Sequence, residues 1–261
     1  MKKIALALTA IAAMTGSAVA ADMAPRYAKA PAPVVVAASW TGCYLGGGGG
    51  YGLWNQENTQ YAGLGAARVQ QEATHTNGGR GYFGTVQAGC DYQFGSQFVI
   101  GAFGDYDFSS EKGIFAAQFG NYTGSEKLSS SWAIGARAGW IALPGLLTYF
   151  TAGYTESTFD RTNLNFFPAL AVAPLYFDKQ TYKGFFIGAG DEYALSFLPG
   201  LFWKTEYRFS DLDTRTNPVR IVATGLPTGV VETDSHKYVH TVRSELVYRF
   251  NWGGSAVVAK Y

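Results

Sequence analysis

The sequence lacks any long apolar run beyond its first 20 residues, which excludes membrane-spanning helices. A helix that crosses a bilayer needs about 18 or more consecutive apolar residues, and no run of that length follows. Charged residues are also scarce, at 15% against a norm of roughly 25% in soluble domains. The 20 basic and 19 acidic residues nearly balance, so the charge gives no reason to expect a nucleic-acid partner.

Residues suited to catalysis or metal binding are equally few. Two cysteines and three histidines occur in 261 residues, and two cysteines without a nearby histidine do not make up a zinc ligand set. The sequence contains no Gly-x-Ser-x-Gly, no His-Glu-x-x-His and no Ser/His/Asp grouping on adjacent strand ends. His236 with Asp234 and Glu232 is the nearest approach to a catalytic group, and we interpret it as a solvated loop. The sequence therefore predicts no enzyme activity, no cofactor and no metal.

The glycine run from Gly46 to Gly50 resembles a phosphate loop in composition alone. It lacks the Lys-Ser/Thr pair that grips phosphate, and no helix follows it. Glycines inside a strand instead let a bulky neighbour pack against bare backbone. We therefore expect a lumen side chain, such as an arginine, to lie against this run.

The amino terminus has the layout of a cleavable secretory signal. Two lysines precede an apolar run from Ile4 to Met14, and a small-residue triplet follows that ends at Ala20. The next segment is rich in Ala and Pro and resists regular structure. The sequence thus predicts a signal peptide (1–20), a periplasmic linker (21–39), an outer-membrane β-barrel (40–252) and a C-terminal tail (253–261).

The full chain is rich in glycine, with 33 residues, and in aromatic side chains, at 16%, and nearly all of these residues follow the signal. Eight extended segments, each of about 10 to 15 residues, are long enough to cross a bilayer core as tilted strands. The mean strand of soluble proteins is only about 5–6 residues long. The segments are Trp40–Asn55, Gly81–Phe94, Phe98–Ser109, Ser130–Ala142, Leu147–Thr158, Thr181–Leu195, Leu201–Asp213 and Tyr238–Trp252.

The connections between these segments alternate between short and long. Three are tight turns built from Gly and Pro, at residues 95–97, 143–146 and 196–200. Four run to roughly 20–25 residues, at 56–80, 110–129, 159–180 and 214–237. Outer-membrane barrels have short periplasmic turns and long external loops. The pattern predicts an all-β fold, an eight-stranded antiparallel up-and-down transmembrane β-barrel, with long loops extracellular and both termini periplasmic.

Side chains in each segment separate into an apolar and a polar face. A strand alternates strictly between faces, and in a membrane barrel the apolar face meets lipid while charges enter the lumen. The predicted lumen charges are Asp91, Asp105, Asp107, Arg137, Glu192, Lys204, Glu206, Arg208, Arg243, Glu245 and Arg249. A small barrel has room only for side chains, and an unpaired buried charge costs several kcal/mol. We interpret these charges as a structural ion-pair plug; a gated pore or proton-responsive element is the alternative.

Aromatic residues gather near the ends of the apolar faces. Amphipathic rings settle at the two membrane–water boundaries, which predicts an aromatic girdle. The girdle residues are Trp132, Trp140, Trp203, Tyr207, Phe209, Tyr248 and Phe250. The soluble alternative is a lipocalin-like barrel, whose apolar face would line a ligand cavity. Strand length and the aromatic-ended faces favour the membrane barrel.

Three motifs carry a family resemblance: Trp40 to Gly47 (WTGCYLGG), Gly89 to Gln93 (GCDYQ) and Gly188 to Tyr193 (GAGDEY). With the signal and the Ala/Pro linker, they make the chain resemble the alphaproteobacterial outer-membrane β-barrel proteins, the porin-like group of the Omp25/Omp31 and RopB type. The resemblance covers essentially the whole mature chain. It implies an eight-stranded outer-membrane barrel that contributes to envelope integrity and surface properties. The tail beyond Trp252 departs from such chains, which usually stop near the last aromatic residue.

The two cysteines lie in the first two predicted strands. If these strands pair as a hairpin with Trp54 opposite Gly79, then Cys43 lies directly across from Cys90, with both side chains outward near the periplasmic rim. The envelope outside the inner membrane is oxidising. We predict a cross-strand disulfide, the alternative being two free thiols, because adjacent-strand pairs must meet a strict geometry.

The predicted function is that of an integral protein of the cell outer membrane with a structural or surface role. The alternatives are a small diffusion porin for hydrophilic solutes and a barrel enzyme. Expected partners are outer-membrane lipids and lipopolysaccharide, the barrel-assembly machinery during insertion and, as an open possibility, further copies in a homo-oligomer. The apolar loop run from Phe166 to Val172 is a candidate contact site for a partner or lipid, or a patch folded back on the rim.

Overall fold

The computed structural model describes residues 39–250, except residues 64, 118–121 and 167–173. The predicted signal peptide, the linker up to residue 38, the end of the last predicted strand and the C-terminal tail lie outside the described residues. So does the apolar loop run, apart from the backbone of Phe166.

Eight long strands make up the wall of the barrel. They are β1 (Gly42–Ala62), β3 (His75–Phe94), β4 (Phe98–Ala117), β5 (Tyr122–Leu143), β6 (Leu146–Phe159), β9 (Gln180–Ala194), β10 (Leu201–Ile221) and β11 (Pro227–Phe250). Three short strands and one 3₁₀ helix complete the described elements: β2 (Val69–Gln70), β7 (Thr162–Phe166), β8 (Leu175–Phe177) and η2 (Gly65–Ala67). No helix among these residues is long and apolar enough to cross a membrane.

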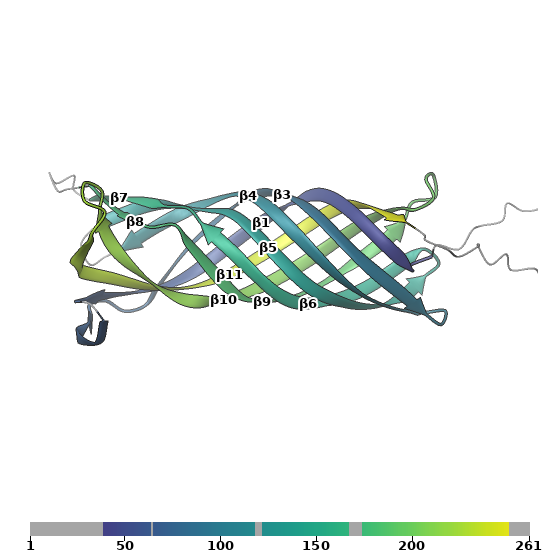
Figure 1. Cartoon of the computed structure of the whole chain (residues 1–261), viewed down its shortest axis with the longest axis horizontal. Coiled ribbons are helices and arrows are strands. Elements are labelled where there is room, and N and C mark those ends of the chain that lie inside the picture. The colour runs from purple at the N-terminus through teal and green to yellow at the C-terminus, as the bar shows by residue number, and fades with distance from the viewer. Residues whose placement is uncertain (1–38, 64, 118–121, 167–173, 251–261) are drawn as a thin grey trace, which may run out of the picture. The chain divides into compact units, whose positions relative to one another are not determined.

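The long strands pair with their neighbours in an antiparallel ring that closes. Their order is β1, β3, β4, β5, β6, β9, β10 and β11, and β11 pairs back to β1 from Cys43–Phe250 to Ala62–Val231. Figure 1 shows these strands side by side around a common axis. The predicted eight-stranded up-and-down barrel is confirmed.

The strands run much further than the sequence predicts, so the expected lengths of the long loops are wrong. Strand β4 continues to Ala117, and β11 begins at Pro227. The extended parts carry polar residues at inward as well as outward positions, which weakens the apolar–polar alternation that marks a strand. Gln56 and Asn58 are fully buried inside the barrel, while Glu57 between them is exposed. The backbone ladder continues because it does not depend on apolar side chains.

The three predicted short turns are confirmed. Each contains a glycine with positive φ: Gly95 at 62°, Gly145 at 83° and Gly200 at 86°. The connection from β10 to β11, expected to be long, is a fourth tight turn over residues 222–226. Gly225 in that turn has a φ of 71°, in the left-handed region that glycine adopts without strain.

Side chains fill the barrel interior in successive layers. The layer nearest the short turns contains Trp40, Tyr44, Val99, Phe103, Ala133, Leu147, Tyr149, Phe186, Phe202 and Val247. A second layer contains Trp54, Leu128, Phe159, Tyr182, Leu212 and Val239. The third, which includes residues of β7 and β8, contains Phe115, Tyr122, Leu164, Leu175, Phe177 and Val219. The lumen is therefore packed with rings as well as charges.

Candidate functional site

All eleven charged residues predicted for the lumen point inward, and each is at most 8% exposed. They come from β3, β4, β5, β9, β10 and β11. Five are basic (Arg137, Lys204, Arg208, Arg243, Arg249) and six are acidic (Asp91, Asp105, Asp107, Glu192, Glu206, Glu245). Strict alternation along each strand brings them to one face.

Four of these residues form a neutral group near the short turns, which we call the turn-end cluster: Asp91, Arg137, Glu192 and Arg249. Arg137 Nε donates to Asp91 Oδ1 at 2.8 Å, and its Nη1 donates to Glu192 Oε2 at 2.6 Å. Arg249 binds the same two acids, Asp91 Oδ2 at 2.6 Å and Glu192 Oε1 at 2.8 Å. Each arginine thus bridges both carboxylates, and Arg137 Nη2 also donates to Asp91 Oδ2, which completes the two parallel hydrogen bonds that make an arginine–carboxylate pair strong.

Aromatic rings surround this cluster. The Tyr44 ring lies between the two guanidinium groups, with its centroid 5.1 Å from Arg137 Cζ and 4.9 Å from Arg249 Cζ. Arg249 also donates to the carbonyl of Trp40 at 2.9 Å. Trp40 is fully buried, and its ring centroid is 4.8 Å from that of Phe202. The turn end of the lumen is therefore closed by rings packed on ion pairs.

A second group, the middle cluster, consists of Gln87, Asp105, Asp107, Lys204, Glu206, Arg208, Arg243 and Glu245. Arg208 binds Asp105 with two hydrogen bonds of 3.1 and 2.8 Å. Arg243 donates to Asp107 at 3.0 Å and lies 3.5 Å from Asp105. The acids of β4 thus meet the bases of β10 and β11 across the barrel interior.

Gln87 joins the remaining members of the middle cluster. Its Oε1 accepts from Lys204 Nζ at 2.8 Å, and its Nε2 donates to the Glu245 carboxylate. Lys204 Nζ is also 3.4 Å from Glu206. Gln87 lies on the inward face of β3, between exposed Val86 and Ala88. The sequence analysis did not identify it as a link, because an amide between two charges has no local signature.

A third ion pair, between Glu126 and Lys237, was missed by the sequence analysis. Lys237 Nζ lies 2.7 Å from Glu126 Oε1 and 5.1, 4.1 and 4.8 Å from the ring centroids of Trp54, Phe159 and Tyr182. Both charges fall in segments predicted as loops. The alternation of the last strand carries the signal for Lys237, since inward residues continue in odd numbers from Arg249 down to residue 233.

Bulky lumen side chains lie against the glycine run, as expected, and the nearest are Phe83, Gln87 and Val247 in place of an arginine; backbone carbonyls of β3 and β11 also come close. A Cβ on Gly50 would approach the Phe83 ring to 2.5 Å, and one on Gly46 would approach Gln87 to 3.1 Å. Phe83 lies on the inward face of β3 next to β1. The glycines therefore make room for bulky lumen side chains, as expected, but not for a guanidinium group.

Cys43 and Cys90 form a disulfide across β1 and β3. The register pairs Cys43 with Cys90 and Trp54 with Gly79, as the sequence predicts. Both cysteines lie on the outer face.

Comparison with known proteins supplies the family. No family model matches the chain. It is 32% identical over 256 residues to the 31 kDa outer-membrane immunogenic protein of Brucella melitensis, and equally to that of Brucella suis, covering 96% of this chain and 100% of each relative. The chain belongs to the family of these 31 kDa outer-membrane proteins. It is therefore an integral outer-membrane β-barrel protein, and the resemblance drawn from its motifs is confirmed.

Solved outer-membrane proteins are similar to this family member at much lower identity. OprG from Pseudomonas aeruginosa is 10% identical, with a TM-score of 0.46, covering 82% of this chain and 99% of that one. A major outer-membrane protein from Thermus thermophilus is 9% identical, with a TM-score of 0.42, covering 77% and 99%.

The outer face of this outer-membrane barrel is apolar. Six of the predicted girdle residues are 36–50% exposed in the isolated chain, and Phe209 is half-buried. The six are Trp132, Trp140, Trp203, Tyr207, Tyr248 and Phe250. Small or aliphatic residues lie between the ring-bearing positions, including Ile134, Ala136 and Ala138 on β5.

All three histidines of this family member lie in strands. His75 and His236 were predicted to lie in long loops, and that prediction is wrong. His75 is the first residue of β3. His236, within β11, hydrogen-bonds Asp211 at 2.9 Å, and His240 bonds the Tyr207 hydroxyl at 2.8 Å. The strand extension explains the difference. Among the described residues, no group of three or more His, Cys, Asp or Glu residues is arranged to hold a metal ion.

Arg68 fastens the β1–β3 connection to the outer surface of β11. It binds Asp234 through two hydrogen bonds of 2.9 and 2.8 Å and lies 3.8 Å from Glu232. Its guanidinium carbon is 4.2 Å from the Tyr61 ring centroid. The hydrogen bonds to Asp234 raise the pKa of Arg68 above its usual value. Asp234 and Glu232 are thus engaged by Arg68 and not by His236.

Proposed function

We propose that this outer-membrane protein is a structural and surface component whose lumen is closed to solutes. The observation that supports this most strongly is the turn-end cluster, whose ion pairs lie beneath the fully buried ring of Trp40. The middle cluster and the Glu126–Lys237 pair add two further filled levels. A conducting pore needs a continuous polar path, and these layers leave none that avoids a paired charge or a ring. The diffusion-porin alternative is not favoured.

Conductance of the refolded protein in a planar bilayer tests the closed lumen. We expect no discrete open-channel steps from the wild-type chain. The variant Phe103→Ala/Phe186→Ala, which removes two lumen rings whose centroids lie 6.1 Å apart, is measured beside it. This variant should not conduct either, because the turn-end cluster and Trp40 stay in place. Reproducible steps from the wild-type protein would show that the lumen is open.

We further propose that the end of the barrel with the extended strands faces outward from the cell and that the three short turns face the periplasm. Short turns lie on the periplasmic side in outer-membrane barrels. The Brucella relatives are named immunogenic, which fits a surface-exposed end in this family. The polar outer faces of the extended strands, with Glu57 and Arg68, suit contact with water and lipopolysaccharide better than with lipid tails.

Thiol labelling in intact cells tests this orientation, because both native cysteines are bonded to each other. Ala66→Cys in η2 should react with a membrane-impermeant maleimide, whereas Ser96→Cys in a short turn should react only after the outer membrane is permeabilised. Both positions are exposed. The opposite labelling pattern would reverse the proposed orientation.

A further inference from the structure

One ladder in the barrel wall is interrupted between β10 and its neighbours β9 and β8. Strand β10 pairs with β9 up to Leu212–Gly184, and with β8 again from Arg220–Tyr176. Between these points, residues 213–219 of β10 and residues 177–183 face each other without strand pairing. We call these two segments the β9–β10 seam.

Two irregularities at different heights explain the seam. Strand β10 has a bulge between Leu212 and Thr214, after which its inward residues change from even to odd numbers. On the facing segment, which runs from β9 back to β8, the inward residues also change from even to odd numbers, but only between Tyr182 and Phe177. Continued pairing would set buried Tyr182 against exposed Thr214, on opposite faces. A one-residue shift moves every side chain to the other face, so the ladder cannot continue through this stretch.

Side chains take the place of the missing ladder bonds. Asp213 Oδ1 accepts a hydrogen bond from the Lys183 N–H at 2.9 Å. Asn217 Nδ2 donates to the Arg215 carbonyl at 3.4 Å and to the Tyr182 hydroxyl at 3.0 Å. The seam is therefore a stretch of the wall that polar side chains hold in place of ladder hydrogen bonds.

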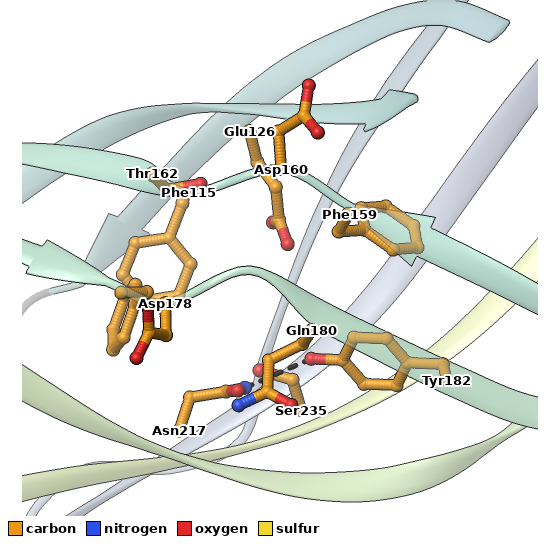
Figure 2. Close-up of a pocket in the computed structure, with 11 residues that line it drawn as sticks. Phe115, Glu126, Phe159, Asp160, Thr162, Asp178, Gln180, Tyr182, Asn217 and Ser235 are labelled. Carbon is orange, nitrogen blue, oxygen red and sulfur yellow. Dashed lines mark hydrogen bonds between the residues drawn. The ribbon is translucent and has the colours of Figure 1, made fainter. Parts of the chain in front are cut away.

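A cavity of about 20 Å³ lies against this seam. Figure 2 shows residues that line it, among them Glu126, Asp160 and Asp178 and the rings of Phe159 and Tyr182. The cavity is large enough for one group the size of a water molecule, which needs roughly 10–15 Å³. A larger ligand must therefore present a small head group and leave its remaining atoms in the seam.

Two buried oxygens that line the cavity have no hydrogen-bond partner within the described part of the chain: Glu126 Oε2 and Asn217 Oδ1. Asn217 is 7% exposed and Glu126 is 9% exposed. Leaving a buried acceptor unmatched costs free energy, so both oxygens favour an occupant that donates hydrogen bonds. The carboxylates of Asp160 and Asp178, which are 41% and 51% exposed, pair with Lys127 and Arg220.

The chain itself places an ammonium group beside this cavity. Lys237 Nζ binds the other oxygen of Glu126, Oε1, and lies 4.1 and 4.8 Å from the Phe159 and Tyr182 ring centroids. The cavity shares these three side chains and adds the two unmatched oxygens. A carboxylate with aromatic faces is the chemistry that binds ammonium cations.

We propose that this cavity binds the ammonium head of a small primary amine, whose alkyl chain leaves through the β9–β10 seam. The N–H groups donate to Glu126 Oε2 and Asn217 Oδ1, and the positive charge lies near the Phe159 and Tyr182 rings. This site does not depend on whether the lumen conducts.

Titration of the ¹⁵N-labelled, refolded full-length protein with n-butylammonium chloride tests the proposal. We expect saturable shifts of the Asn217, Tyr182 and Ser235 amide signals. Potassium chloride and tetramethylammonium chloride serve as control salts, because neither cation donates N–H hydrogen bonds. An equal response to either control salt would overturn the proposal.

Two variants with opposite expected effects accompany this titration. Asn217→Leu removes an acceptor and fills the space, and should weaken butylammonium binding at least ten-fold. Asn217→Asp adds a negative charge at the same place and should tighten binding several-fold. The matched control is Asn163→Leu, an exposed position outside the cavity lining. If both Asn217 variants bind butylammonium as tightly as the wild-type protein does, the proposed site is overturned. If one variant folds poorly, the other still decides the outcome.

Discussion

Arg249 in the last strand donates a 2.6 Å hydrogen bond to Asp91 in β3, a residue 158 positions earlier in the chain. The same guanidinium binds Glu192 of β9 at 2.8 Å. These contacts join three strands that are not direct neighbours: β1 separates β11 from β3, and β10 separates β11 from β9. The turn-end cluster therefore forms only when β11 has closed the barrel, and it makes closure energetically favourable.

Replacing Arg249 with methionine leaves Asp91 and Glu192 to share Arg137 alone. Removing one partner from a buried ion pair costs about 3–5 kcal/mol, because the other charge stays buried and uncompensated. We expect a loss of that size in the free energy of unfolding by urea in lipid vesicles. Arg215→Met is the control, since its side chain is 37% exposed and pairs with Asp213, and such pairs contribute about 1 kcal/mol or less. Equal losses in the two variants would contradict the role of the turn-end cluster.

The disulfide closes a segment of 47 residues between Cys43 and Cys90. A cross-link of this span stabilises by restricting the unfolded chain, typically by about 2–4 kcal/mol. Cys43→Ala/Cys90→Ala should therefore lower the free energy of unfolding by that amount while the barrel still forms, because the β1–β3 ladder does not depend on the bond. The intact mass should rise by two hydrogens on reduction of the wild-type chain; an unchanged mass means free thiols.

Gly50 and Gly47 are a matched pair for testing the glycine run. A Cβ at Gly50 would clash with the Val242 backbone carbonyl and would meet the Phe83 ring at 2.5 Å, whereas one at Gly47 would have its nearest neighbour, the Thr85 carbonyl, at 3.6 Å. We expect Gly50→Ala to destabilise the barrel by roughly 1–3 kcal/mol through overpacking. Gly47→Ala should change it by no more than about 0.5 kcal/mol. Urea unfolding of both variants measures the difference, and similar values would show that the Phe83 ring and the backbone at Val242 both shift at little cost.

The sequence predicted the parts of the fold that alternate between apolar and polar residues. In β11, Leu246 and Tyr248 alternate with Glu245 and Arg249, so both the strand and its inward face were evident. The Cys43–Cys90 register followed from a hairpin with one assumed pairing. Partner choice did not follow: that Arg137 meets both Asp91 and Glu192 depends on the tilt and stagger of eight strands, which local sequence does not encode.

Two further features could not be predicted, for a different reason. The extended strand ends carry polar residues on both faces, such as Gln56 and Glu57, so they look like loops. The β9–β10 seam arises from a bulge at residue 213 and from a change of face at residues 178–179. A bulge shifts the pattern by a single residue, which is not distinguishable from an imperfect repeat in one sequence.

Arg68 holds the β1–β3 connection through Asp234. Because this ion pair is partly exposed to water, it should contribute little to the free energy of unfolding. Arg68→Ala should change the free energy of unfolding by about 1 kcal/mol or less. It should nevertheless speed proteolytic cleavage around residues 63–74, since the connection loses its main anchor. Arg80→Ala, at an exposed arginine outside this contact, is the control. Because salt screens exposed charges, the difference in cleavage rate should shrink as ionic strength rises; a salt-independent difference would point to a packing effect.

Variants of Lys237 and Glu126 test whether their buried ion pair stabilises the barrel, or whether each charge only prevents the other from being buried without a partner. Lys237→Met keeps an unbranched side chain against the Phe159 and Tyr182 rings but leaves the Glu126 carboxylate without its 2.7 Å partner. We expect a loss of about 3–5 kcal/mol. Lys237→Met/Glu126→Leu removes both charges and should recover most of that loss, because apolar replacements of a buried ion pair are often neutral or stabilising. A double variant as unstable as Lys237→Met would show that the pair itself, and not the absence of an uncompensated charge, supplies the stability. Urea unfolding of Lys237→Met, Glu126→Leu and the double variant gives the coupling energy of the pair.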